Sequence, residues 1–261
     1  MVFASARLES LHQTLTTRAK RELAKRGYRL SRREQIQVAP EFWRFHELCH
    51  EQTMTSIERM VALHDAVRHV VAHEIPGDFV ECGVWRGGSS MLAALTFAHL
   101  DDLSRDLYLF DTFDGMPEPS SLDLDPNGQP ALGLWEKTRT DAHNKWCYAS
   151  LEEVTSNMAN TSYPQEQIHL VKGKVEQTLP DHAPQRISIL RLDTDWYEST
   201  LHELRTLFPR LADGGVLILD DYDHWKGAKQ AVDEWLRESE EPILLHRIDH
   251  TARIGVKAPR C

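Results

Sequence analysis

The chain has 261 residues, 41% of them hydrophobic and 27% charged, which suits one α/β domain with extensions. Its formal net charge of −10 argues against a nucleic-acid partner, and no apolar run approaches the roughly 18 residues that a membrane span needs. The first residues hold no apolar stretch typical of a secretion signal, and the four cysteines are widely spaced, so we expect a cytoplasmic protein without a disulfide framework.

Charge is unevenly distributed along the chain. Residues 1–33 carry nine Lys or Arg and two Glu, a net charge of +7, which leaves −17 for the remainder. A basic arm of this kind can contact nucleic acid or anionic lipid. Because the arm is short, we favour a helix face that packs on the acidic body or on a second subunit. We therefore expect a homo-oligomer, most simply a dimer, with contacts from the N-terminal arm.

Helical periodicity dominates the first part of the chain and strands the second. Apolar residues recur with helical spacing over 4–26, 41–50 and 55–74, which predicts a helical extension over residues 1–75. Short apolar runs then follow at 78–83, 107–111, 168–172, 187–193 and 216–221. Helical segments separate them at 88–100, 149–160, 198–211 and 226–238. The alternation predicts a doubly wound, mostly parallel sheet in an α/β domain over residues 76–261.

Two segments interrupt this alternation. Residues 243–248 and 253–257 are apolar runs joined by polar residues, which predicts an antiparallel hairpin and brings the sheet to seven strands. Residues 112–148 are rich in Pro and Gly and form a long connection between two elements. Long connections in compact domains are commonly functional, so we predict that this one is an active-site lid.

Open α/β sheets bind ligands beyond the carboxyl ends of their strands. The first predicted strand contains Glu81, and a glycine turn follows that starts at Gly83 and includes Ser89, where a ligand can approach the backbone. The turn lacks the GxGxxG spacing of dinucleotide sites, and the chain has no P-loop. Asp111 ends the second strand, where it can either accept hydrogen bonds from a ribose or order a turn.

Acidic residues end two further strands. Asp193 and Asp195 lie at and after the end of the fourth predicted strand, and Asp220 and Asp221 end the fifth. If these strands are neighbours, Asp193, Asp220 and Asp221 meet at one edge of the sheet. Three ionised carboxylates share a small space only when another charge offsets theirs. The pattern therefore predicts a site for a hard divalent cation such as Mg²⁺.

One motif points to a different metal. Residues 46–50 (HELCH) match the HExxH pattern of zinc proteases. The aromatic residues at 42–45 are typical of a packing face, and no third ligand follows at the spacing that a zinc protease needs. We interpret the segment as a packed helix.

Six stretches carry a family resemblance. They are TMTSIERM (53–60), GDFVECGVWRGGSSMLAAL (77–95), LFDTFDGMPEP (109–119), WCYASLEEV (146–154), LRLDTDWYEST (190–200) and GGVLILDDYDHWKGAKQAVDEWL (214–236). In this order the chain resembles the macrocin O-methyltransferase family over about residues 50–238. The resemblance implies a class I methyltransferase-like fold. It also implies an enzyme that uses S-adenosylmethionine and Mg²⁺ to methylate a sugar hydroxyl, on a natural-product deoxysugar or on an oligosaccharide or polysaccharide.

The resemblance implies roles for single residues. The expected S-adenosylmethionine site comprises Met54, Thr55, Glu81, Gly83, Ser89 and, at the ribose, Asp111. The expected metal ligands are Asp193, Asp220 and Asp221, with Asp195 as the general base. His143, on the predicted lid, is an alternative base.

Other functions fit parts of the pattern. A Mg²⁺-dependent O-methyltransferase of catechols or other small diols would use the same acids beside an aromatic acceptor pocket. A dinucleotide-dependent oxidoreductase is disfavoured because GxGxxG is missing. A protein that binds cofactor or glycan without catalysis is disfavoured because an acid is present at each expected position.

Overall fold

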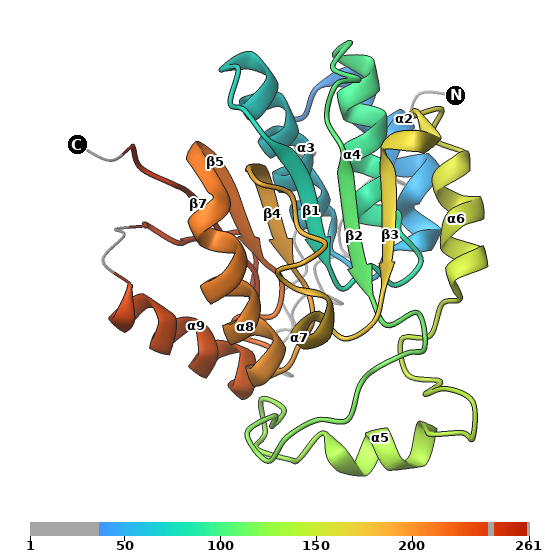
Figure 1. Cartoon of the computed structure of the whole chain (residues 1–261), viewed down its shortest axis with the longest axis vertical. Coiled ribbons are helices and arrows are strands. Elements are labelled where there is room, and N and C mark those ends of the chain that lie inside the picture. Colours follow the sequence, from blue (N-terminus) through green and yellow to red (C-terminus); the bar gives the residue numbers. More distant parts are fainter. Residues whose placement is uncertain (1–36, 240–242, 260–261) are drawn as a thin grey trace, which may run out of the picture. The chain divides into compact units, whose positions relative to one another are not determined.

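Five parallel strands and a C-terminal antiparallel hairpin form the seven-stranded sheet that the sequence predicts (Figure 1). The computed structural model describes residues 37–239 and 243–259. Pro40–Cys261 is one compact unit, so the helices of residues 40–72 belong to the same unit as the sheet, whereas the sequence suggests a boundary at 75/76. The helix predicted over 4–26 and the basic arm lie outside the described residues.

The order of the strands explains where a ligand can bind. It is β3-β2-β1-β4-β5-β7-β6. The strands are β1 (Asp78–Cys82), β2 (Leu107–Asp111), β3 (Ile168–Lys172), β4 (Ile187–Leu192), β5 (Leu211–Leu219), β6 (His246–Arg247) and β7 (Arg253–Val256). β1 to β5 are parallel, and β7 is antiparallel to both β5 and β6. β1, β2 and β3 follow one another toward one edge of the sheet, and β4 and β5 are added on the other side of β1. The strand order therefore reverses between β1 and β4, and a crevice is expected at the carboxyl ends of these two strands.

Helices cover both faces of this sheet (Figure 1). They are α2 (Pro40–Cys49), α3 (Ile57–Ala72), α4 (Gly88–His99), α6 (Leu151–Ala159), α7 (Val175–Thr178), α8 (Tyr197–Leu207) and α9 (Lys226–Glu238). α2, α3, α4 and α6 pack together on one face, and α7, α8 and α9 on the other. Because both faces are covered, every residue of β4 is buried, which is why its sequence is an almost continuous apolar run.

Two strands differ in length from the prediction. β5 begins at Leu211 rather than at residue 216, because the preceding helix ends at residue 207 and Pro209 lies in a 3-10 turn that cannot continue it. β6 contains only His246–Arg247, and the apolar side chains of Ile243 and Leu245 pack on the core instead. The predicted antiparallel hairpin is confirmed, with a shorter first strand.

Residues 112–148, called the 112–148 loop below, contain a short helix, α5 (Leu132–Thr138). The Asp123 carboxylate in this loop is fully buried, and its Oδ1 accepts a hydrogen bond from the backbone N–H of Tyr197 at 2.8 Å, at the start of α8. The carbonyl of Leu124 accepts one from the backbone N–H of Lys226 at 2.9 Å, at the start of α9. These first N–H groups of a helix have no partner within the helix, so the loop satisfies them and is docked on the body.

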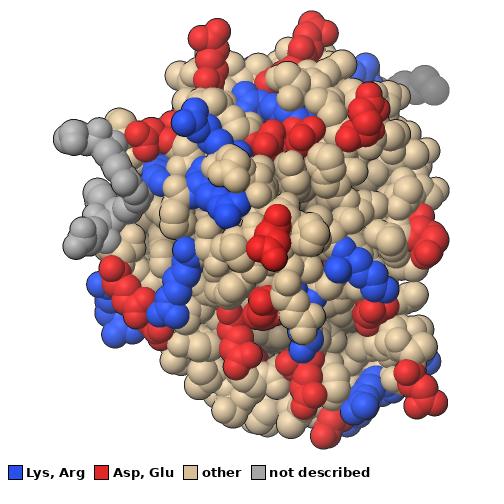
Figure 2. Space-filling view, in the orientation of Figure 1, with Lys and Arg blue, Asp and Glu red and all other residues tan. Residues whose placement is uncertain are grey.

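The surface gives two further observations. On the face in Figure 2, Lys and Arg side chains are interspersed with Asp and Glu side chains. In the part of the chain that the structure describes, no helix combines the length and the apolar character that crossing a membrane requires.

Candidate functional site

A cavity of about 530 Å³ lies at the carboxyl ends of β1, β2, β4 and β5, where the order of the strands places a crevice. Several sequence-distant segments line it. They are residues 52–56 with Arg59, 83–85 with Ser89, 110–112, 115–117, 146–147, 173–176, 191–195 with Ser199, 220–225 and 250–251, with some gaps within these ranges.

The glycine turn after β1 lies close against the end of the neighbouring strand β4. Gly83 has a φ of +82°, and a Cβ added there would lie 2.0 Å from the carbonyl oxygen of Asp193. Glycine is thus required by the close approach of the ends of β1 and β4, whether or not a ligand binds. Ser89, in the first turn of α4, is buried and lines the cavity.

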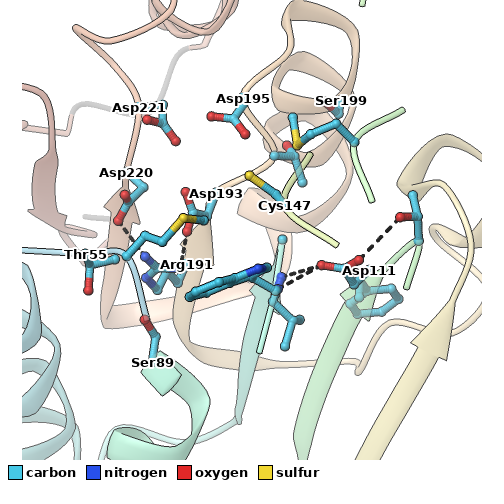
Figure 3. Close-up of a pocket in the computed structure, with 18 of the residues that line it drawn as sticks. Thr55, Ser89, Asp111, Cys147, Arg191, Asp193, Asp195, Ser199, Asp220 and Asp221 are labelled. Carbon is cyan, nitrogen blue, oxygen red and sulfur yellow. Dashed lines mark hydrogen bonds and ion pairs between the residues drawn. The ribbon is translucent and has the colours of Figure 1, made fainter. Parts of the chain in front are cut away.

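Asp111 joins two turns at the end of β2. Its Oδ2 accepts hydrogen bonds from the backbone N–H groups of Val84 at 2.7 Å and Trp85 at 3.1 Å, and its Oδ1 accepts one from Phe113 at 2.8 Å. Burial raises the pKa of Asp111, and these N–H groups act against that rise. Asp111 therefore orders the two turns, which is one of the alternatives from the sequence, and it also lines the cavity (Figure 3); ribose binding stays a prediction.

Two arginines link the acids on one side of the cavity. Arg191 Nη1 donates to Glu81 Oε1 at 2.6 Å and Asp193 Oδ2 at 2.9 Å, and its Nη2 donates to Asp220 Oδ1 at 2.5 Å. Arg59, near the start of α3, contacts the other oxygen of Asp220 and donates through Nε to Asp249 Oδ2 at 2.8 Å. We call the series Glu81, Arg191, Asp220, Arg59 and Asp249 the charge chain, because acids and arginines alternate along it.

Three aspartates that line the cavity have a single arginine between them among the ion pairs of the described residues. Asp193, Asp195 and Asp221 point toward one another (Figure 3), and a carboxylate oxygen of each lies within 4.8 Å of the others. Asp193 shares Arg191 with two other acids. Burial raises the pKa of Asp193 and Asp221 well above the usual range, and burial together with the charge of Asp193 raises the pKa of Asp195 to about 7.

This set of donors fits a hard divalent cation. All three side chains offer oxygen, which Mg²⁺ and Ca²⁺ prefer, and they are partly exposed to the cavity, which leaves room for water or substrate oxygen. A cation would offset the repulsion that raises their pKa values. Within residues 37–239 and 243–259, this is the one cluster of three or more His, Cys, Asp or Glu side chains with such convergent ligand atoms.

The structure places the other predicted site residues as follows. Met54, which is 63% exposed, and Thr55 line the cavity. Asp220 also lines it, but both of its oxygens contact arginines, so Asp195 rather than Asp220 completes the converging group. Glu81 differs from the expectation, because it is 1% exposed and lies behind the cavity wall, where it pairs with Arg191.

The structure also shows where the histidines singled out in the sequence lie. His143 does not line the cavity, and its ring stacks on Tyr148 with a centroid separation of 4.0 Å, so this geometry does not place it near the acids. His46 and His50 stack on each other on one side of the helix at residues 40–52, with their centroids 5.5 Å apart. Neither belongs to the convergent acidic group, in agreement with the interpretation of HELCH as a packed helix.

Sequence reasoning missed several residues of the site. Arg191 is a charged residue in a fully buried strand, and such a residue signals a buried partner. Arg59 and Asp249 have no local signal, because they are 190 residues apart and meet only in the fold. Trp225 and Trp146 line the cavity beside the acids, and the sequence identifies only Trp146, as part of the predicted lid.

Comparisons with known proteins give a consistent result. The family model described as "Macrocin-O-methyltransferase (TylF)" matches residues 5–254. The chain is 36% identical over 170 residues to the 8-demethyl-8-(2,3-dimethoxy-alpha-L-rhamnosyl)-tetracenomycin-C 4'-O-methyltransferase of Streptomyces olivaceus, covering 65% of this chain and 62% of that protein. It is 33% identical over 183 residues to the demethyldecarbamoylnovobiocin O-methyltransferase of Streptomyces niveus, covering 70% of this chain and 67% of that protein. The matches thus span about two thirds of these curated relatives.

The fold comparison agrees with the sequence comparison. The structure of the O-methyltransferase NovP matches with a TM-score of 0.71 and 30% sequence identity, over 80% of this chain and 83% of that chain. The predicted α/β methyltransferase fold is confirmed. Because the family model spans nearly the whole sequence and a solved O-methyltransferase shares its fold, the chain belongs to the macrocin O-methyltransferase family.

Proposed function

We propose that the protein is a Mg²⁺-dependent O-methyltransferase that moves the methyl group of S-adenosylmethionine to a sugar hydroxyl of a glycoside. The observation that carries the proposal is the convergence of Asp193, Asp195 and Asp221 in a cavity next to the glycine turn. The names of the relatives support the acceptor class, since one acts on a rhamnosyl tetracenomycin and another on a novobiocin precursor.

S-adenosylmethionine is proposed to lie along the β1 and β2 side of the cavity. Met54, Thr55, Gly83 and Ser89 line that side, together with Asp111. Asp111 would act there in two ways, by holding the turns at Val84 and Phe113 and by offering its carboxylate to the ribose hydroxyls. Glu81 would act indirectly, by holding Arg191 from behind the wall.

Asp193 and Asp221 are the proposed core of the metal site. A bound divalent ion would lower the pKa of the acceptor hydroxyl and stabilise the negative charge that develops on its oxygen. The family resemblance implies Asp220 as the third ligand, and in this structure its two carboxylate oxygens contact Arg59 and Arg191. Asp195 would remain as the base.

Asp195 is suited to accept the hydroxyl proton. Its pKa of about 7 in the metal-free protein is near the value that suits a general base at neutral pH. With S-adenosylmethionine bound, the acceptor oxygen would form a bond to the methyl carbon while the carbon–sulfur bond breaks, its electron pair would stay on sulfur, and Asp195 would take the proton. The products are the methyl ether and S-adenosylhomocysteine.

The proposal is tested by incubating the protein with S-adenosylmethionine and Mg²⁺ against a panel of pyranosides and glycosides, with S-adenosylhomocysteine release as the readout. Sugar-dependent release that EDTA abolishes supports the proposal. Release only with a catechol panel would assign the alternative diol methyltransferase, and full activity in EDTA would refute the metal requirement.

A further inference from the structure

Three tryptophans form a cluster beside the acids. Trp196 follows β4, Trp225 follows β5, and Trp146 comes from the 112–148 loop. The centroid of Trp225 is 5.0 Å from that of Trp196 and 5.8 Å from that of Trp146, with the rings inclined by 73° and 57°. Trp146 and Trp225 line the cavity, whereas Trp196 packs behind them and is 4% exposed. We call Trp146, Trp225 and the adjacent Met116 the aromatic wall.

The aromatic wall is built into the fold and does not depend on a ligand. The backbone N–H of Trp146 donates to Asn144 Oδ1 at 2.9 Å, and its carbonyl accepts from Met116 at 3.0 Å. Behind the wall, Trp196 Nε1 donates to the Pro117 carbonyl at 3.0 Å. The contacts of Asp123 and Leu124 with α8 and α9 hold the rest of the loop in place.

The aromatic wall and the acids line the same cavity, but the wall is apolar and the acids are polar. Trp225 and Asp195 both line this cavity, so an indole ring and carboxylate oxygens border the space that a ligand would fill. The glycine turn and Asp111, which carry the proposed cofactor site, lie at the ends of β1 and β2 instead. A ligand between the wall and the acids must therefore be polar on one side and apolar on the other. A pyranoside has this character, because its hydroxyls project around a ring whose C–H groups form apolar faces.

We propose that the aromatic wall is the acceptor subsite, in which Trp146 packs on the apolar face of the sugar ring while a ring hydroxyl is directed at the acids. Trp225 extends the apolar surface of Trp146, since the centroids of the two rings are 5.8 Å apart. This inference rests on the proposed function and extends it to the residues that determine acceptor binding.

The two tryptophans have different expected kinetic effects. Trp146→Ala removes the packing surface, so we expect the KM for the acceptor to rise about tenfold with kcat within about twofold, and the Kd of S-adenosylhomocysteine to stay unchanged. Trp225→Phe keeps an aromatic ring in the wall, so kcat and the KM for the acceptor should both stay within about twofold of the native values. Trp43→Ala, on α2 and 44% exposed away from the cavity, is the matched control and should change neither.

The experiment uses the full chain with Mg²⁺ and takes as acceptor each pyranoside of the panel, beginning with methyl α-L-rhamnopyranoside. Calorimetry with S-adenosylhomocysteine and saturation-transfer NMR on the sugar protons give readouts that do not require turnover. If the native protein methylates or binds no pyranoside, the proposed function and this inference both fail. If it methylates one and Trp146→Ala leaves its KM unchanged, or weakens S-adenosylhomocysteine instead, the inference alone is refuted.

Discussion

The docking of the 112–148 loop predicts that Asp123→Ala destabilises the fold and frees the loop. Asp123 is fully buried, and its Oδ2 accepts hydrogen bonds from the backbone N–H and the hydroxyl of Ser120 at 2.7 and 2.8 Å, while its Oδ1 caps α8 through Tyr197. Loss of a helix cap costs about 1 kcal/mol, and a charged acceptor at a helix N-terminus adds to this. With the bonds to Ser120 also lost, we expect a decrease in the free energy of unfolding of about 2–3 kcal/mol.

For a domain of this size each kcal/mol lowers Tm by about 2–4 °C, so calorimetry should give a fall of roughly 4–12 °C. Trypsin should also cleave the loop faster, at Lys137, Arg139 or Lys145. Asp141→Ala is the matched control, because Asp141 is an exposed acid of the same loop, and it should change neither measurement. A Tm within about 2 °C of the native value, with unchanged cleavage, would refute the docking argument.

Three further predictions concern the cavity. Asp111→Ala should weaken S-adenosylmethionine binding by about 1.5–3 kcal/mol in calorimetry, and an unchanged Kd in the folded variant would contradict the cofactor placement. Asp193→Asn should lose Mg²⁺ affinity, whereas Asp195→Asn should keep it and lower kcat by roughly 10²–10⁴; the opposite pattern in calorimetry and kinetics would exchange the two roles. The folded-state pKa of Asp195, about 7, is raised above its ordinary value of 3.8, so its ionisation in metal-free protein costs stability as pH rises through that window. In EDTA the Tm should therefore fall between about pH 4 and about pH 7, and Mg²⁺ should raise Tm more at the higher pH. A Mg²⁺ effect on Tm that is independent of pH would argue against a cation at these acids.

The sequence is sufficient for those parts of the fold and site that depend on local pattern and strand neighbours. The five apolar runs became parallel strands because both faces of the sheet are covered, and Asp193 and Asp221 meet because β4 and β5 are adjacent. Asp195 joins them through a backbone with a φ of +67°, a left-handed conformation that no spacing rule anticipates for aspartate.

Other features depend on partners that are distant in sequence. Glu81 is an acid, as expected for a ligand contact, but its carboxylate is paired with Arg191 on the neighbouring strand β4. His143 is on the predicted lid, yet it stacks on Tyr148 within the same loop. In both cases a tertiary contact, which the sequence pattern does not encode, sets the direction of the side chain.

If the aspartates bind a cation as proposed, the charge chain lets Asp249, which lies outside the cavity wall, affect the affinity for that cation. Burial would raise the pKa of Asp249, but the backbone N–H of Ala252 and the guanidinium of Arg59 hold it well below its usual value, so it remains ionised. Each arginine in the series is shared, and a neutral residue at 249 would leave the whole charge of Arg59 directed at Asp220. Arg59 would then compete more strongly with a cation for the carboxylate of Asp220. Under this proposal, a neutral substitution of Asp249, in the turn between β6 and β7, would lower the ion affinity although Asp249 is not itself a ligand.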